Sequence, residues 1–216
     1  MKIFILLLAV IFSACATAKM PKKQTDRERD GFAGKVANVY VSTVFPSKVR
    51  CGKDSSSYDV EGRLTKHNVY TKGCADEKIK INYTYSDDGK RMSSSNGVTG
   101  SPTTFNFDAD GRLANEISAF NENESVQVNY LYDEKGRIIE KTYANNGTQY
   151  GKDVYEYEGE NKAPSKFTYT NTKDNSSATI TYTAYEFNSA GDWTKREETA
   201  RATNSYIERS IEYYID

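Results

Sequence analysis

The chain has 216 residues, the length of one or two domains, and its 29 lysines and arginines nearly balance 30 aspartates and glutamates. This balance excludes the strongly basic surface of nucleic-acid-binding proteins, so no nucleic-acid partner is expected. Only 37% of the residues are hydrophobic, but 17 tyrosines and 9 phenylalanines supply enough buriable surface to exclude a disordered chain. With one histidine and three cysteines, the composition predicts no metal site and no cofactor.

The first 14 residues have the organisation of a signal peptide. Lys2 precedes an apolar run over residues 3–12, which is too short to span a bilayer. Ser13-Ala14-Cys15 resembles the lipobox of bacterial lipoproteins and predicts cleavage before Cys15 and lipidation of that cysteine. Cleavage after Ala18 stays open as the alternative, because residues 16–18 also fit the small-x-small rule.

Lipidation would make the membrane a partner of the chain through Cys15. Residues 15–34 are then expected to form the lipidated cysteine and a polar tether, followed by one β domain over residues 35–216. No aspartate follows Cys15, which by resemblance to Gram-negative sorting favours the outer membrane. We therefore expect an exported outer-membrane lipoprotein facing the periplasm or the cell surface.

The two remaining cysteines are expected to pair. Outside the cytosol, a disulfide between Cys51 and Cys74 is the natural state of two cysteines, with two free thiols as the alternative. Their spacing matches no zinc pattern, and His67 alone does not complete one.

Glycine-marked segments recur along the chain. Three are close copies of Tyr/Phe-Asp-x-x-Gly-Arg-Leu/Ile, at residues 58–64, 107–113 and 132–138, and weaker copies centre on Gly89, Gly159 and Gly191. The aspartate can accept a backbone N–H bond at the first turn position, and the glycine can take the positive φ that closes a type I hairpin turn with a bulge. Each copy therefore predicts a hairpin tip.

Between these tips the sequence alternates with a period of two. Residues 79–85 and 126–132 place isoleucine, valine and tyrosine on one face and polar residues on the other, and the pattern breaks at Thr183-Ala184 as a β-bulge would break it. The pattern predicts an all-β fold, an antiparallel meander of about 12–14 strands built from these hairpins. Strand twist should curl it into a curled single sheet or an open barrel-like roll.

The hairpin signature resembles the YD repeat of the rearrangement hot spot (Rhs) family, over roughly residues 55–216. Residues 30–36 and 193–196 are similar to the opening and closing segments of small exported YD-repeat lipoproteins. In large members the resemblance implies a β shell around a toxin domain. No such domain is expected after Asp216, so the encapsulation role should not carry over. The signature residues build turns, and the resemblance implies no catalytic residue.

Aromatic side chains are the candidate binding residues. Trp193, Tyr83, Tyr130 and Tyr182 could stack on a glycan or anchor a protein ligand, and the other interpretation of alternating tyrosines is that they form the core. We expect a lipid-anchored, non-enzymatic envelope protein that acts by binding or by structural contact. The alternative is an envelope enzyme that acts on glycans with turn carboxylates in a tyrosine-lined groove. The sequence predicts no oligomeric state.

Overall fold

The computed structural model describes residues 22–45, 50–70, 78–87, 90–95, 98–121, 123–200 and 203–215. Over these ranges the chain forms one short helix and fifteen strands of a single antiparallel sheet. The elements are α1 (Asp26–Arg29), β1 (Val36–Val44), β2 (Arg50–Tyr58), β3 (Leu64–Tyr70), β4 (Lys78–Tyr85), β5 (Arg91–Ser95), β6 (Val98–Thr99), β7 (Thr103–Phe107), β8 (Leu113–Asn121), β9 (Glu124–Tyr132), β10 (Ile138–Asn145), β11 (Thr148–Glu156), β12 (Lys166–Asn171), β13 (Ser177–Phe187), β14 (Trp193–Ala200) and β15 (Thr203–Tyr213).

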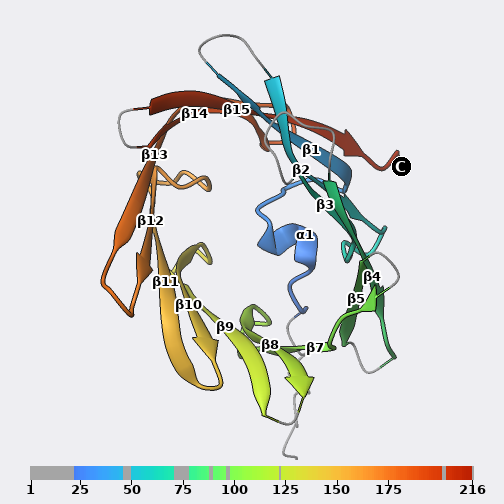
Figure 1. The fold of residues 1–216 in the computed structure, drawn as a ribbon. Coiled ribbons are helices and arrows are strands. Elements are labelled where there is room, and N and C mark those ends of the chain that lie inside the picture. The colour runs from blue at the N-terminus through green and yellow to red at the C-terminus, as the bar shows by residue number, and fades with distance from the viewer. Residues whose placement is uncertain are drawn as a thin grey trace, which may run out of the picture.

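The sheet closes into a barrel in which neighbours in sequence are neighbours in space (Figure 1). Strands β1 to β5 and β7 to β15 pair in chain order, β5 pairs with β7, and β15 pairs with β1. Since β6 pairs only with β5, fourteen of the described strands form the wall. The predicted single antiparallel sheet is confirmed. The sequence predicted either a curled sheet or an open barrel-like roll, whereas the observed sheet closes on itself. Closure removes both sheet edges, because the last strand hydrogen-bonds to the first.

The hairpin tips have the geometry that their residues predict. In the 132–138 copy, the Asp133 carboxylate accepts bonds from the N–H groups of Lys135 (3.0 Å) and Arg137 (2.9 Å) and from the Arg137 Nε (2.7 Å). Positive φ is confirmed at Gly62, Gly111, Gly136, Gly159 and Gly191, while Gly89 lies outside the described residues. The predicted bulge is also confirmed, because the β13–β14 register shifts after Thr183 and Ala184 has a φ of 49°.

A tyrosine from the following repeat holds each of the three close copies of the turn. The Arg137 guanidinium lies over the Tyr157 ring, 4.4 Å from its centroid, and the Tyr157 hydroxyl donates to the Ile138 carbonyl at 2.8 Å. The same pair of contacts joins Arg112 and Leu113 to Tyr132, and Arg63 and Leu64 to Tyr85. The repeated tyrosine therefore connects successive hairpins as well as filling the interior.

Residues 22–34, here called the inner segment, lie inside the barrel (Figure 1) and correct the prediction of a tether over residues 15–34. Thr25 and Glu28 form a capping box that starts α1. Asp26 accepts bonds from the Leu64 N–H (2.8 Å) and the Tyr85 hydroxyl, and the Gln24 N–H donates to the Gly111 carbonyl at 2.7 Å. This polar segment is held because the hairpin tips offer it backbone partners.

The positions of the predicted lipidation site and disulfide are only partly covered by the described residues. Cys15 lies outside them. Cys51 is buried and disulfide-bonded, while Cys74 lies outside the described residues, so the pairing of these two cysteines stays a prediction. Within the described ranges, no helix is long and apolar enough to cross a membrane.

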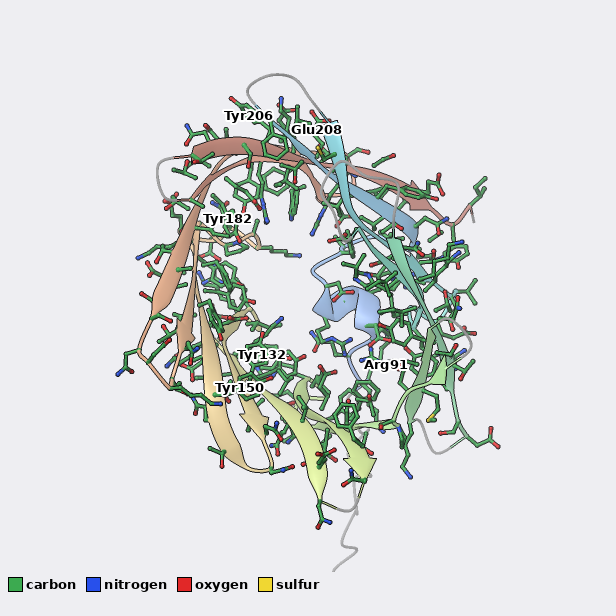
Figure 2. The ribbon with its side chains drawn as sticks, viewed as in Figure 1. Arg91, Tyr132, Tyr150, Tyr182, Tyr206 and Glu208 are labelled. Atoms are coloured by element: carbon green, nitrogen blue, oxygen red, sulfur yellow. The ribbon has the colours of Figure 1, made fainter. Side chains whose placement is uncertain are left out.

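The two faces of the wall differ in chemistry. Tyr132 and Tyr182 point into the barrel, whereas Tyr206 and Glu208 lie on its outer face (Figure 2). The fully apolar core is small, with one cluster around Phe32, Val36, Val39 and Tyr58 and a second around Ala163, Trp193 and Ile207. The rest of the interior contains tyrosines and charged side chains.

Candidate functional site

A cavity of about 760 Å³ lies inside the barrel, between the wall and the inner segment. Its aromatic lining comes from both sides of the barrel and consists of Phe32, Tyr58, Tyr83, Tyr155, Tyr157, Phe187 and Trp193. Among the described residues, His67 and eight lysines and arginines line it, namely Arg29, Arg91, Lys135, Arg137, Lys141, Lys162, Arg196 and Arg209. Three carboxylates, Glu28, Asp30 and Asp54, lie in the same lining. The lining is therefore aromatic and contains more basic than acidic side chains.

All four predicted binding aromatics lie on this inner side. Tyr83 and Trp193 line the cavity, and Tyr130 and Tyr182 are half-buried beside it. Each ring contacts a cation: Arg91 lies 4.9 Å from the Tyr83 centroid, Lys141 5.5 Å from that of Tyr130, and Arg196 3.9 Å from that of Tyr182 and 4.3 Å from that of Trp193. Burial, which favours the neutral phenol, raises the pKa of Tyr182 to about 12. These rings therefore position cations at the cavity.

The basic side chains were not predicted from the sequence, although a signal for them exists. Arg209 stands between Ile207 and Ile211 in β15, and Lys141 precedes Tyr143 by two residues in β10. Since a strand alternates its faces, a basic residue in step with apolar ones must also point inward. Read this way, period-two patterning identifies both residues.

Five of the eight cavity cations are already neutralised by carboxylates. Arg29 is paired with Asp26, Arg91 with Glu116 and Asp26, Lys135 with Glu160, Arg137 with Asp133, and Arg196 with Glu198. No ion pair is formed by Lys141, Lys162 or Arg209 within the part of the chain that the structure describes. Lys162 is exposed in the loop before β12, whereas Lys141 and Arg209 are half-buried on the wall.

Arg209 occupies the more unusual of the two wall positions. Its Cζ lies 3.5 Å from the Trp193 ring centroid and 5.0 Å from that of Phe32, and its Nε is buried with no hydrogen-bond partner among the described residues. Burial and the neighbouring Arg196 lower its pKa to about 10, so the guanidinium stays charged at neutral pH. A buried cation with an unsatisfied donor is destabilising by itself.

Lys141 faces the same cavity from β10. Its Nζ lies 5.5 Å from the Tyr130 centroid and 5.6 Å from that of Tyr155, and burial lowers its pKa. Aromatic faces stabilise a cation by about 0.5–2 kcal/mol, less than a full ion pair in a buried site. Lys141 is therefore a second cavity cation whose charge is only partly compensated.

The carboxylates that the enzymatic alternative would use are already bound. Asp59, Asp108 and Asp133 each bind the arginine of their own turn, at 2.7 to 2.8 Å. Around the inner segment, burial would raise the pKa of Asp26, but Arg29, Tyr85 and the Leu64 N–H lower it overall. A general acid needs a raised pKa, whereas hydrogen bonds and the neighbouring arginines lower the pKa of Asp26, Asp108 and Asp133, so these three carboxylates act as structural anions.

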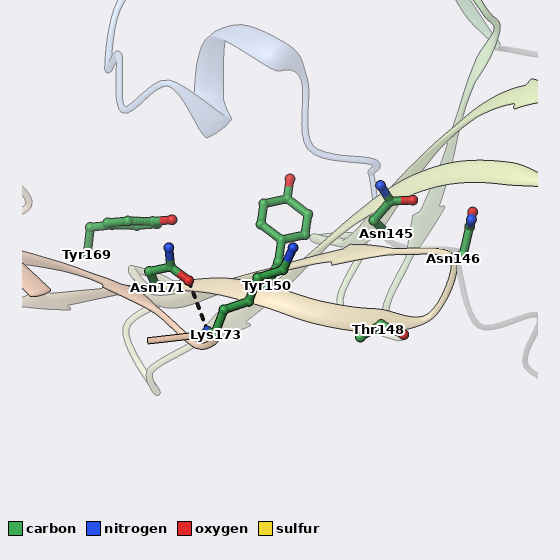
Figure 3. A pocket seen from close by; sticks show the side chains of 7 residues that line it. All are labelled: Asn145, Asn146, Thr148, Tyr150, Tyr169, Asn171 and Lys173. Carbon is green, nitrogen blue, oxygen red and sulfur yellow. Dashed lines mark hydrogen bonds between the residues drawn. The ribbon is translucent and has the colours of Figure 1, made fainter. Parts of the chain in front are cut away.

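A second, smaller pocket of about 570 Å³ lies at the β10–β11 and β12–β13 hairpins (Figure 3). Tyr150 and Tyr169 line it, and the Lys173 N–H donates to Asn171 Oδ1 at 2.9 Å. Asn145 and Thr148 are the exposed last and first residues of β10 and β11, and Asn146 and Lys173 are exposed turn residues. Its described lining has no buried polar group aimed at a ligand, and the interior cavity is the stronger candidate.

Comparison with known proteins gives no family for the chain. No family model and no curated protein matches its sequence. Among solved structures, it is similar to a porin-like protein of Bacteroides uniformis (13% identity, 82% of this chain and 98% of that chain, TM-score 0.47) and to one of Bacteroides vulgatus (10% identity, 83% and 99%, TM-score 0.44). A Vibrio parahaemolyticus domain described as an outer membrane lipoprotein-sorting protein has 14% identity over 88% of this chain and 90% of that chain, with a TM-score of 0.38. These scores are too low to establish a shared fold.

Proposed function

We propose that this chain is a lipid-anchored envelope protein whose YD-repeat barrel binds a small glycan-like ligand in its interior. The observation that carries the proposal is the cavity of about 760 Å³, lined by aromatic rings and by charged groups of the wall. Ligand sites are concave, with aromatic walls and a few converging polar groups, and this cavity has both properties. A protein partner is less well supported, because the cavity lies within the barrel.

The YD-repeat assignment is supported by the hairpin tips. The three close sequence copies share the aspartate–arginine contact and the tyrosine contact from the next repeat. These contacts give the signature a structural task in every copy, so its residues are not expected to act on a substrate. This favours binding over catalysis.

Envelope anchoring rests on the leader and Cys15. Labelling of growing cells with a radioactive fatty acid should mark the chain, and Cys15→Ser should abolish the label while Cys51→Ser should not. An unlabelled wild-type chain with cleavage after Ala18 would leave the barrel without its anchor and contradict this part of the proposal.

The ligand can be sought without guessing its identity. The protein is purified in mild detergent from the envelope of the cells that produce it and is then denatured. The small molecules released on denaturation are identified by mass spectrometry. Ser56 lines the cavity from β2, so Ser56→Trp should fill the site and lose the retained compound. Ser57 lies on the opposite face of the same strand, and Ser57→Trp is the matched control. Interior binding would be refuted if the wild-type protein releases no compound, or if the Ser56→Trp and Ser57→Trp variants retain the compound equally.

A further inference from the structure

The cavity contains two half-buried cations that form no ion pair with any described residue, Arg209 on β15 and Lys141 on β10. The other wall cations show how the fold normally treats such groups, since Arg196 is paired with Glu198 at 2.6 Å and Arg137 with Asp133 at 2.7 Å. Burying a charge without a partner is unfavourable, so the exception at Arg209 requires an explanation.

The surroundings of Arg209 fix its guanidinium without neutralising it. Trp193 lies 3.5 Å and Phe32 5.0 Å away, measured from Cζ to the ring centroids, which leaves the planar group little freedom to turn. Arg196 lies over the same Trp193 ring, at 4.3 Å, so a second guanidinium adds positive charge close by. The Asp54 and Asp30 carboxylates attract this charge, but no ion pair joins either of them to Arg209 among the described residues, and Asp30 accepts a hydrogen bond from Tyr58 at 2.6 Å.

A preorganised guanidinium with a free N–H matches one kind of ligand group. Arginine binds carboxylate and phosphate oxygens through paired N–H donors, and a fixed side chain loses little entropy on binding. No described residue accepts a hydrogen bond from the buried Arg209 Nε, and a ligand oxyanion bound to this guanidinium from the cavity would compensate its charge.

The geometry points to an oxyanion site centred on Arg209, in a cavity that Lys141 also lines, so that the interior ligand is an acidic sugar carrying a carboxylate or a phosphate. This inference rests on the proposed function and names the chemical class of its ligand. Tyr155 and Tyr157 supply aromatic surface for the sugar ring in the same lining.

Three sugars with the same ring separate the alternatives, because they differ only at C6: glucose has a hydroxyl, glucuronate a carboxylate and glucose 6-phosphate a phosphate. Binding to the full chain in detergent is followed by the emission of Trp193, the single tryptophan of the sequence, which touches the proposed site. We expect at least one acidic sugar to bind about tenfold or more tightly than glucose, as a charge-assisted hydrogen bond would give. The better acidic ligand then distinguishes a carboxylate from a phosphate.

Variants test whether Arg209 causes the preference for the acidic sugar. Arg209→Met should reduce the preference for the acidic sugar about tenfold, and Arg209→Lys, which keeps the charge but loses the planar donors, should reduce it partly. Lys195→Met is the control, since Lys195 lies over Tyr206 on the outer face and its removal changes the net charge equally. Thermal unfolding of each variant verifies that the barrel is intact.

Three results would overturn the inference. Glucose could bind as tightly as the acidic sugars, Lys195→Met could reduce the preference as much as Arg209→Met, or no sugar could alter Trp193 emission up to about 100 mM, a concentration at which even millimolar binding saturates. In each case, the search for a retained compound in the wild type and in Ser56→Trp still tests whether the interior binds any ligand. The proposal of interior binding and the inference of an acidic ligand can therefore fail separately.

Discussion

At the scale of single residues, the two arginines against Trp193 should have opposite effects on stability. Arg196→Met leaves the buried Glu198 carboxylate without this partner and should lower the free energy of unfolding by about 3 kcal/mol. Arg209→Met removes a half-buried charge that forms no ion pair with a described carboxylate and keeps an apolar contact with Phe32 and Trp193, so stability should stay equal or rise by about 1 kcal/mol. Urea unfolding followed by circular dichroism measures both. A large loss in Arg209→Met would mean that this arginine is structural.

The glycine of a hairpin tip should matter more than the exposed residue before it. Gly136 has a φ of 75°, and a Cβ added there would meet no described atom within 4 Å, so Gly136→Val should be destabilising through backbone strain alone, by about 1–2 kcal/mol. Lys135 makes an exposed ion pair with Glu160, and Lys135→Ala should change little. Equal melting temperatures for the two variants would contradict the role of the turn.

Sequence patterning could predict which aromatic residues face inward but not what they contact. Period two places Tyr130 and Tyr182 on the inner face, because every second residue of a strand points the same way. The same alternation places Lys141 and Arg209 on the inner face, but it gives no sign that a cavity lies there. Whether a tyrosine surface is filled or hollow depends on barrel diameter, which no single strand encodes.

At the scale of elements, the inner segment is expected to depend on Asp26. This buried carboxylate binds Arg29, the Tyr85 hydroxyl and the Leu64 N–H, so Asp26→Asn should release residues 22–34 from the barrel wall. Hydrogen exchange of those amides should quicken by about tenfold or more. Glu61→Gln, at an exposed turn position, is the control and should leave their exchange unchanged.

The same contact should depend on pH with a defined sign. Burial opposes the charge of Asp26, but Arg29 and the hydrogen bonds keep its folded-state pKa below the ordinary 3.8. Stabilisation by the carboxylate is therefore complete above that pH and is lost as the pH falls below it. Exchange of residues 22–34 in the wild type should approach that of Asp26→Asn only in this acidic range. Similar exchange of the two proteins at neutral pH would contradict the ion-pair argument.

The inner segment also explains why the tether prediction was wrong for residues 22–34. A run of charged and polar residues is normally solvated, and no apolar stripe marks this one for burial. Here the interior is itself polar, because the hairpin tips direct backbone groups such as the Gly111 carbonyl and the Leu64 N–H toward the segment. Local composition could not reveal partners that closure of the barrel brings together.

At the scale of the whole molecule, sequential pairing was predictable and closure was not. Each hairpin follows from a local turn signal, so the order of strands along the sheet follows from the sequence. Closure depends on the pairing of β15 with β1, whose register runs from Val36 opposite Tyr213 to Val44 opposite Tyr206. These residues are far apart in the chain, and no turn connects them.

Closure should therefore be the cooperative element of the fold. Deleting residues 203–216 removes the fully buried Ile207 and the pairings of β15 with both β1 and β14, leaving two unpaired edges. We expect this truncation to lose its single cooperative thermal transition in circular dichroism and to aggregate at concentrations where the wild type stays monodisperse. Deleting only residues 215 and 216 is the control, because Ile215 is 99% exposed and the wall stays closed. A cooperative transition that survives loss of β15 would mean that the curled sheet is stable while open, and that closure serves the cavity and not the stability of the fold.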